Sequence, residues 1–189
     1  MDTIKWQNIS YLETGTENQK RAFITLKKHR ILDYLFAYDP VLVSTVCVNL
    51  DIDGSDLDII CQHKNTDEFK IVVKKKFGQF PDFKQWMRKS DFEEIVTSFK
   101  ADDFEIEIFS SRIPVKKQFA YRHLLMMDKT LQIGGEPLRK KVKTLKSDGL
   151  KTEPAFAKVL GLTGDPFLAF LELEKFNDDQ LNELIKKNS

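Results

Sequence analysis

Apolar residues follow two different spacings along the chain. Between residues 41 and 111, short apolar runs alternate with polar residues at period two, which is typical of half-buried strands: VLVSTVCVNLDI, DLDIIC, EEIVTSFK and DFEIEIFSS. After Pro114 the apolar residues recur every three or four positions. This spacing predicts a helix there and further helices near 136–147, 153–161, 166–174 and 178–187. The chain therefore changes from a strand-rich part to a helical part.

The segment before the strands predicts one more helix. Thr16 and Gln19 match a capping box, and an apolar stripe follows as far as about Tyr38, where Asp39-Pro40 ends the helix. FKIVVKKKF, later in the chain, fits either a strand or the start of a helix. The N-terminal part thus combines one helix with the strands.

The strands are expected to pair as hairpins. VLVSTVCVNLDI would pair with DLDIIC about Gly54, and EEIVTSFK with DFEIEIFSS through a turn at 101–103. The sequence therefore predicts an α+β fold, in which a mixed or antiparallel sheet is covered by helices on one face. We expect a core over 1–112 and a helical region over 113–189 that packs on it, together forming one structural unit.

Composition narrows the classes of function. The 30 lysines and arginines nearly balance the 29 aspartates and glutamates, so bulk charge does not indicate a nucleic-acid partner. No signal peptide or long apolar span is visible, which predicts a cytoplasmic protein without a membrane partner. Cys47 and Cys61 are then expected to be reduced and buried. The alternative is a redox pair, if 44–52 and 56–62 form a hairpin that places them opposite each other.

The stretch DIDGSDLDIIC holds four aspartates in eight residues. It is not a calcium-binding EF-hand loop, because Asp56 and Gln62 stand where that loop needs glycine and glutamate. On a strand, Asp56 and Asp58 would share one face at a separation of roughly 7 Å. Glu105 and Glu107 would likewise share one face of a later strand. Such carboxylates suit Mg²⁺ or Mn²⁺, whereas the alternative is an ordinary polar hairpin with a turn at 53–55.

The string STVCVNLDIDGSDLDII resembles the signature of the nucleotidyltransferase superfamily, the polymerase β-like fold. That signature is a small-residue pair followed about ten residues later by two acidic residues on a strand. FEIEIF, PVKKQFAYRH and GLKTEPAFAKVLGLTGDPFLAFL extend the resemblance to one bacterial family of this superfamily, the domain-of-unknown-function family numbered 4269. The resemblance covers nearly the whole chain, from ISYLETGTENQKRAF onward.

The resemblance implies a metal-dependent nucleotidyltransferase that moves a nucleoside monophosphate from an NTP to a small molecule, a protein or an RNA end. Asp56 and Asp58 would hold Mg²⁺ or Mn²⁺, with Glu107 as the third acid and Glu105 as its alternative. The residues expected to contact the nucleotide belong to the small-residue turn, the acidic loop and the region after Pro114: Ser44, Thr45, Ser55, Lys117 and Arg122.

The chain departs from the superfamily pattern at two places. Ser44 stands where glycine is expected, and Ser110-Ser111 replaces an expected glycine and glutamine. These departures keep a second hypothesis open, namely a catalytically inactive binding module with the same fold. Whether the protein is an enzyme is therefore undecided from the sequence. His123 lies beside the apolar stripe of its helix, so we expect a hydrogen-bonded structural residue rather than a base.

Overall fold

The computed structural model describes residues 5–188, and the chain divides into two compact units. The strand unit comprises 5–49 and 54–121, and the helical unit comprises 50–53 and 122–188. Among the helices of the described range, none combines the length and the apolarity needed to cross a bilayer. Each unit is described by itself below.

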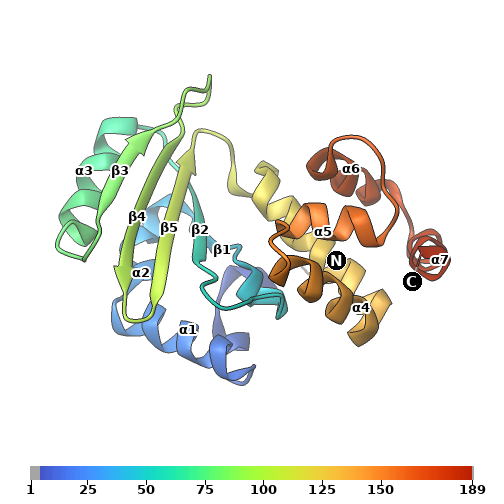
Figure 1. Ribbon diagram of the computed structural model, residues 1–189. Coiled ribbons are helices and arrows are strands. Elements are labelled where there is room, and N and C mark those ends of the chain that lie inside the picture. The colour runs from blue at the N-terminus through green and yellow to red at the C-terminus, as the bar shows by residue number, and fades with distance from the viewer. Residues whose placement is uncertain (1–4, 189) are drawn as a thin grey trace. The chain divides into compact units, whose positions relative to one another are not determined.

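The strand unit contains a mixed five-stranded sheet in the order β1-β2-β5-β4-β3 (Figure 1). The strands are β1 (Val41–Leu42), β2 (Leu57–Gln62), β3 (Lys84–Met87), β4 (Ile95–Ala101) and β5 (Phe104–Ser111). β2 and β5 are parallel, and the other three pairs are antiparallel. The predicted α+β class is confirmed, as is the hairpin of β4 and β5, whose turn places Asp102 at a φ of 50°.

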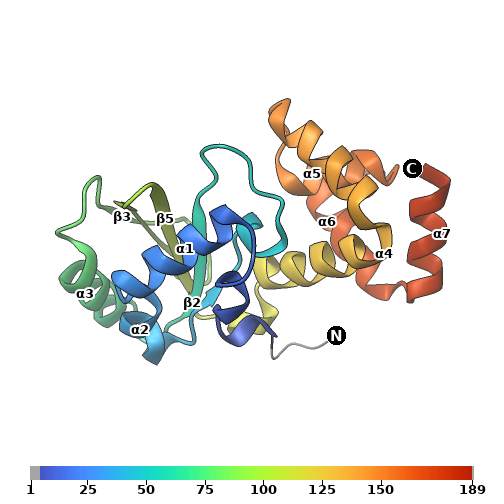
Figure 2. The same ribbon diagram turned by 90° about the horizontal axis from the view of Figure 1, so that it is seen from below.

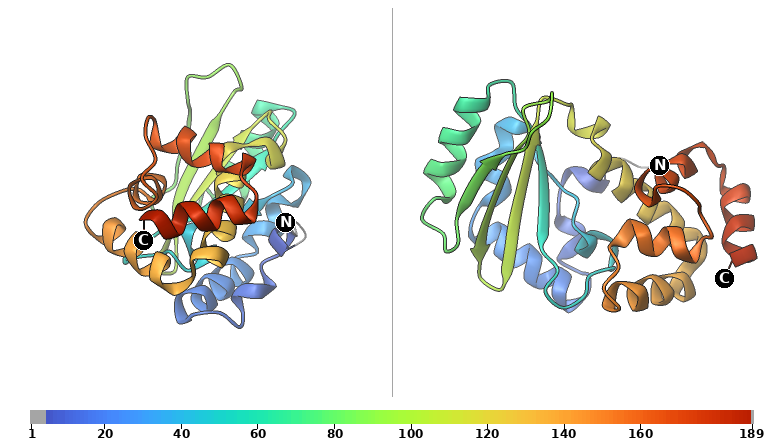
Figure 3. Two further views of the ribbon diagram at one scale, coloured as in Figure 1. Left: turned by 90° about the vertical axis from the view of Figure 1, so that its right-hand side faces the viewer. Right: turned by 45° about the horizontal axis from the view of Figure 1, so that its top comes forward.

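One face of the sheet is apolar and covered by α3 (Thr66–Phe77). Because side chains alternate along a strand, every second residue of β4, β5 and β2 contributes to this face: Ile95, Phe99, Phe104, Ile106, Ile108, Leu57 and Ile59, all buried. Phe77 of α3 stacks on Phe99, with ring centroids 5.0 Å apart. Figure 1 and the right view of Figure 3 show α2 and α3 on the same side of the sheet. The opposite face carries the charged side chains of Asp58, Lys100, Glu105 and Glu107 together with the buried Val96 and Ile60.

The predicted first helix is two helices. α1 (Glu17–Lys28) begins with the expected capping box between Thr16 and Gln19. It ends where Arg30 takes a left-handed conformation at a φ of 53°, and α2 (Ile31–Leu35) follows. The expected single helix to Tyr38 is therefore wrong, because the left-handed residue interrupts the helix between Lys28 and Ile31. A 3₁₀ helix completes the segment as far as Tyr38.

The expected long strand before the acidic loop is also wrong. Only Val41 and Leu42 pair with β2, and the chain then forms a 3₁₀ helix, Thr45–Val48, capped by Ser44. Cys47 lies in that helix and not on a strand opposite Cys61, so the hairpin that the redox alternative requires does not form, and both cysteines are buried. FKIVVKKKF forms most of α3 and is not a strand.

The helical unit contains the predicted helices. They are α4 (Phe119–Ser147), of which the first three residues belong to the strand unit, α5 (Thr152–Val159), α6 (Pro166–Glu172) and α7 (Asp178–Asn188). Figure 2 shows the two parts of α4 running in different directions, because Gly135 has a non-helical φ of 62° and ψ of −158°. Phe156 of α5 stacks on Phe170 of α6 with centroids 4.7 Å apart. Asp165 caps α6 through Phe167 N and Leu168 N.

Candidate active site

The parallel pairing of β2 with β5 brings two of the predicted acids together. Asp58 and Glu107 are register partners on these neighbouring strands. Register partners point to the same face of a sheet, and neighbouring strands lie about 4.8 Å apart. Both side chains are half-buried and face away from the apolar layer under α3. The geometry therefore gives an acidic pair built from two strands that are far apart in sequence.

The register of the strands also shows which of the two glutamates, Glu107 or Glu105, lies beside Asp58. Glu107 lies between Asp58 on β2 and Ser98 on β4, whereas Glu105 is the register partner of Lys100 on β4. Glu107, and not Glu105, is thus the neighbour of Asp58. Of the two alternatives that the sequence leaves open, Glu107 is the one beside Asp58, and its role as the third acid stays a prediction.

Asp56 precedes β2 directly and has an exposed side chain. Val43 and Ser44, which precede the 3₁₀ helix, hold the backbone on both sides of Leu57, the first residue of β2. Ser44 Oγ donates a hydrogen bond of 2.6 Å to Asp56 O, and Val43 N donates one of 2.8 Å to Asp58 O. The two predicted metal ligands therefore have their backbone carbonyls held from one short segment.

Ser44 itself is buried completely and has an extended conformation, with a φ of −60° and a ψ of 152°. Any residue adopts this conformation, so serine in place of glycine causes no backbone strain here. Its hydroxyl donates to Asp56 O and accepts from Val46 N at 3.2 Å. The side chain is therefore occupied in holding the acidic loop, while the neighbouring Thr45 is half-buried.

The donors fit a hard cation that brings further ligands with it. Carboxylate oxygens are the ligands that Mg²⁺ and Mn²⁺ prefer, and Mg²⁺ usually takes one or two carboxylates together with substrate phosphates and water. Within residues 5–188, no group of three or more histidine, cysteine, aspartate or glutamate side chains is arranged to hold a metal ion by itself. Asp58 and Glu107, with Asp56 at the strand's start, supply carboxylate oxygens of the kind that these cations prefer.

The other predicted nucleotide contacts lie in different surroundings. Ser55 is half-buried in the acidic loop, and Lys117 is exposed at the end of the 3₁₀ helix Val115–Lys117. Arg122 belongs to the helical unit, where its guanidinium pairs with Glu174 at 2.7 Å. The hydrogen bond from this guanidinium to the carboxylate raises the pKa of Arg122. Their roles in nucleotide binding stay predictions.

His123 is a structural residue, as expected. Its side chain is buried, its Nε2 lies 3.0 Å from Phe167 O, and its Nδ1 lies 3.3 Å from Glu153 Oε1. The ring also stacks on Phe170 of α6. These contacts connect α4, α5 and α6 within the helical unit and leave both ring nitrogens with partners.

Sequence reasoning missed a buried polar cluster at the other end of β2 and β5. His63 Nδ1 lies 2.9 Å from Ser110 Oγ, and its Nε2 lies 3.3 Å from Thr66 Oγ1. Thr66 Oγ1 donates to Glu93, which also pairs with Arg112 at 2.8 Å. Burial lowers the pKa of His63. The signal was absent from the sequence, because His63 and Ser110 become neighbours only through the parallel pairing.

Comparison with known proteins gives a family and a fold. A family described as a domain of unknown function (DUF4269) matches residues 24–173. No curated protein matches the chain.

Several solved structures share the fold at low sequence identity. A GLD-2/RNP-8 complex aligns with a TM-score of 0.56 and 12% identity over 94% of this chain and 80% of that one. The polymerase core of TRAMP, an RNA surveillance complex, aligns with a TM-score of 0.54 and 16% identity over 95% of this chain and 59% of that one. Cid1, an RNA terminal uridylyl transferase, aligns with a TM-score of 0.51 and 14% identity over 69% of this chain and 41% of that one. This chain thus spans 41% and 59% of the lengths of Cid1 and the TRAMP core. The fold is that of the polymerase β-like nucleotidyltransferases.

Proposed function

The chain belongs to the DUF4269 family and has a nucleotidyltransferase-like fold, and on this premise we propose that it transfers a nucleoside monophosphate from an NTP to an acceptor hydroxyl. The observation that carries the proposal is the register pairing of Asp58 with Glu107, with Asp56 two residues before Asp58. Two strands then supply the acids that the superfamily's chemistry needs.

In the proposed reaction, Asp56, Asp58 and Glu107 would hold Mg²⁺ or Mn²⁺ together with the NTP phosphates. The bound cation would stabilise negative charge on the phosphate oxygens. The acceptor oxygen attacks the α-phosphorus, and the bond from this phosphorus to the bridging oxygen of the β-phosphate breaks. Pyrophosphate leaves, and the hydroxyl proton passes to the Glu107 carboxylate and then to water. Ser44 acts as a positioning residue, because it holds the Asp56 backbone.

The first test measures nucleotide binding by calorimetry with each of the four NTPs and Mg²⁺ or Mn²⁺. We expect binding by the wild-type chain and loss of at least about tenfold in affinity in the Asp56→Asn/Asp58→Asn variant, since two charge-assisted ligand contacts disappear. Asp53→Asn is the matched control, because Asp53 is an exposed aspartate of the same loop. Wild-type chain that binds no NTP with either metal would overturn the proposal.

The competing hypothesis is a binding module without catalysis. It is favoured by Ser44, whose side chain replaces the glycine of the superfamily turn and is fully engaged in hydrogen bonds. Pyrophosphate release separates the two hypotheses. NTP binding without pyrophosphate release, in the presence of a broad set of acceptors, would favour the binding module. The bacterial source and the cytoplasmic location stay predictions.

A further inference from the structure

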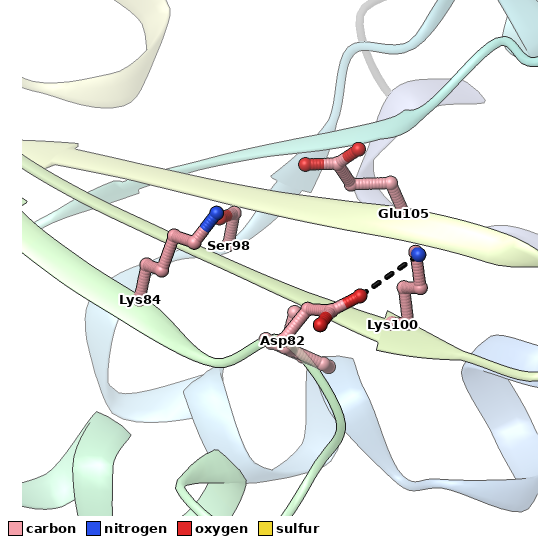
Figure 4. A pocket seen from close by; sticks show the side chains of 6 residues that line it. Asp82, Lys84, Ser98, Lys100 and Glu105 are labelled. Atoms are coloured by element: carbon pink, nitrogen blue, oxygen red, sulfur yellow. Dashed lines mark ion pairs between the residues drawn. The ribbon is translucent and has the colours of Figure 1, made fainter.

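A pocket of about 240 Å³ lies on the polar face of the strand unit (Figure 4). Its lining comes from β3, β4, β5 and the residues just before β3: Asp82, Lys84, Ser98, Phe99, Lys100 and Glu105. Ser98 is the register partner of both Lys84 and Glu107. The pocket is therefore directly beside the proposed third acid, on the side away from Asp58.

The pocket contains equal numbers of positive and negative side chains. Lys100 pairs with Asp82 at 2.8 Å, and Figure 4 shows this ion pair at the pocket. The hydrogen bond between them raises the pKa of Lys100 and lowers that of Asp82, so both stay charged at neutral pH. Lys84 and Glu105 are exposed, and their charges interact with those of Asp82 and Lys100, respectively, without a direct ion pair among the described residues. One cation on β3 and one anion on β5 are thus available to a ligand.

We propose that this pocket binds the acceptor, and that the acceptor is a small hydroxylated molecule carrying one anionic group and one ammonium group. This inference rests on the proposed function for the reaction that follows binding. Lys84 takes the phosphate or carboxylate of the acceptor, and Glu105 takes its ammonium. A hydroxyl held between them lies next to Glu107, which receives its proton as the oxygen bonds to the α-phosphorus and pyrophosphate leaves.

Charge and size both favour such an acceptor over an RNA end. Binding to a polynucleotide depends on an excess of lysine and arginine that neutralises several phosphates. The pocket has no such excess, because Lys84 and Lys100 are balanced by Asp82 and Glu105. Its volume of about 240 Å³ also lies below the roughly 300–1,000 Å³ that is typical for drug-sized ligands. A small molecule with opposite charges at its two ends matches both properties.

The binding test uses the full chain without nucleotide and glucosamine 6-phosphate as the probe, which has hydroxyls, an ammonium and a phosphate. Amide chemical shifts of Ser98, Lys100 and Glu105 report occupancy of the pocket. Glucose 6-phosphate lacks the ammonium and glucosamine lacks the phosphate, so each should bind about threefold to fivefold more weakly, which is the effect of one exposed ion pair.

Variants of the pocket residues assign the contacts. Lys84→Gln should reduce the preference for glucosamine 6-phosphate over glucosamine, and Glu105→Gln should reduce its preference over glucose 6-phosphate. Lys75→Gln is the control, because Lys75 is an exposed lysine of α3 outside the pocket. Thermal melts of each variant verify that it is folded.

The outcomes separate this inference from the proposed function. Pocket shifts with glucosamine 6-phosphate, followed by transfer onto it of the nucleoside monophosphate of an NTP labelled at its α-phosphate, support the inference. Absence of pocket shifts with this probe overturns the inference even if NTP binds. Tighter binding of a short oligoribonucleotide at the same amides overturns it in favour of an RNA acceptor. Failure of the proposed function appears separately, as absence of NTP binding in calorimetry.

Discussion

At the scale of residues, Ser44 connects two segments of the candidate site through one hydroxyl. It caps the 3₁₀ helix through Val46 N and holds the Asp56 carbonyl at 2.6 Å. Both contacts are buried or partly buried, so water does not replace them fully when the hydroxyl is removed. A fully buried side chain can therefore influence how Asp56 is presented to a nucleotide.

This arrangement predicts that restoring the superfamily glycine harms the protein. Ser44→Gly should lower the free energy of unfolding by about 1–2 kcal/mol, because a cap and a hydrogen bond to Asp56 O are lost. The affinity for NTP should also fall, because the acidic loop loses the hydrogen bond from Ser44 to Asp56 O. Urea unfolding and calorimetry measure the two effects, with Ser10→Gly as the control at an exposed serine. A glycine variant that is as stable as wild type and binds NTP more tightly would show that Ser44 obstructs the site.

At the scale of elements, alternation within a strand predicted which side chains share a face, and it did so correctly for β5. Glu105 and Glu107 lie on the face opposite the buried Phe104, Ile106 and Ile108. Alternation does not say which strand lies next to which, so the parallel pairing of β2 with β5 was not predicted. β3 was missed because KQWM is short and largely exposed at a sheet edge. Hence the acids could be named from sequence, but neither their adjacency nor the pocket beside them could.

The same parallel pairing predicts a pH dependence of stability. Burial holds the pKa of His63 in the folded chain below its ordinary value of 6.5. The unfolded chain therefore binds more protons than the folded chain as pH falls through 6.5 and below, so His63 lowers stability progressively in that range. We expect the free energy of unfolding to decrease between pH 7 and pH 5, by less in His63→Gln than in wild type.

Urea titrations at several pH values measure this difference. His29→Gln serves as the control, because His29 is less buried and lies by the β4–β5 turn near Asp102. Wild type and His63→Gln that lose stability in parallel between pH 7 and pH 5 would contradict the assignment to His63. Glu93 contributes in the same direction at lower pH, since the hydrogen bond from Thr66 lowers its pKa.

At the scale of the whole molecule, the general class of fold was accessible from sequence, and the assignment of residues 50–53 was not. The nucleotidyltransferase-like α+β fold and the DUF4269 family are confirmed. The structure assigns 50–53 to the helical unit, between two parts of the strand unit, where buried Lys146 donates to Leu50 O at 2.6 Å. No local pattern reveals a contact across 96 positions. The domain boundary predicted after residue 112 stays a prediction.

The final prediction concerns the linkage of metal, nucleotide and folding. If the acids need phosphate oxygens to complete a metal site, Mn²⁺ and NTP bind as a unit, and each raises the affinity for the other by the same factor. A ligand at about 100 times its dissociation constant stabilises the folded state by about 2.7 kcal/mol. We therefore expect a large rise in melting temperature with Mn²⁺ and NTP together, and little with either alone. The Asp56→Asn/Asp58→Asn variant should lose the joint rise, whereas Asp53→Asn should keep it. If Mn²⁺ alone produced the full rise in melting temperature, the protein would supply a complete metal site by itself. This result would contradict the proposal that phosphate oxygens are needed to complete the site.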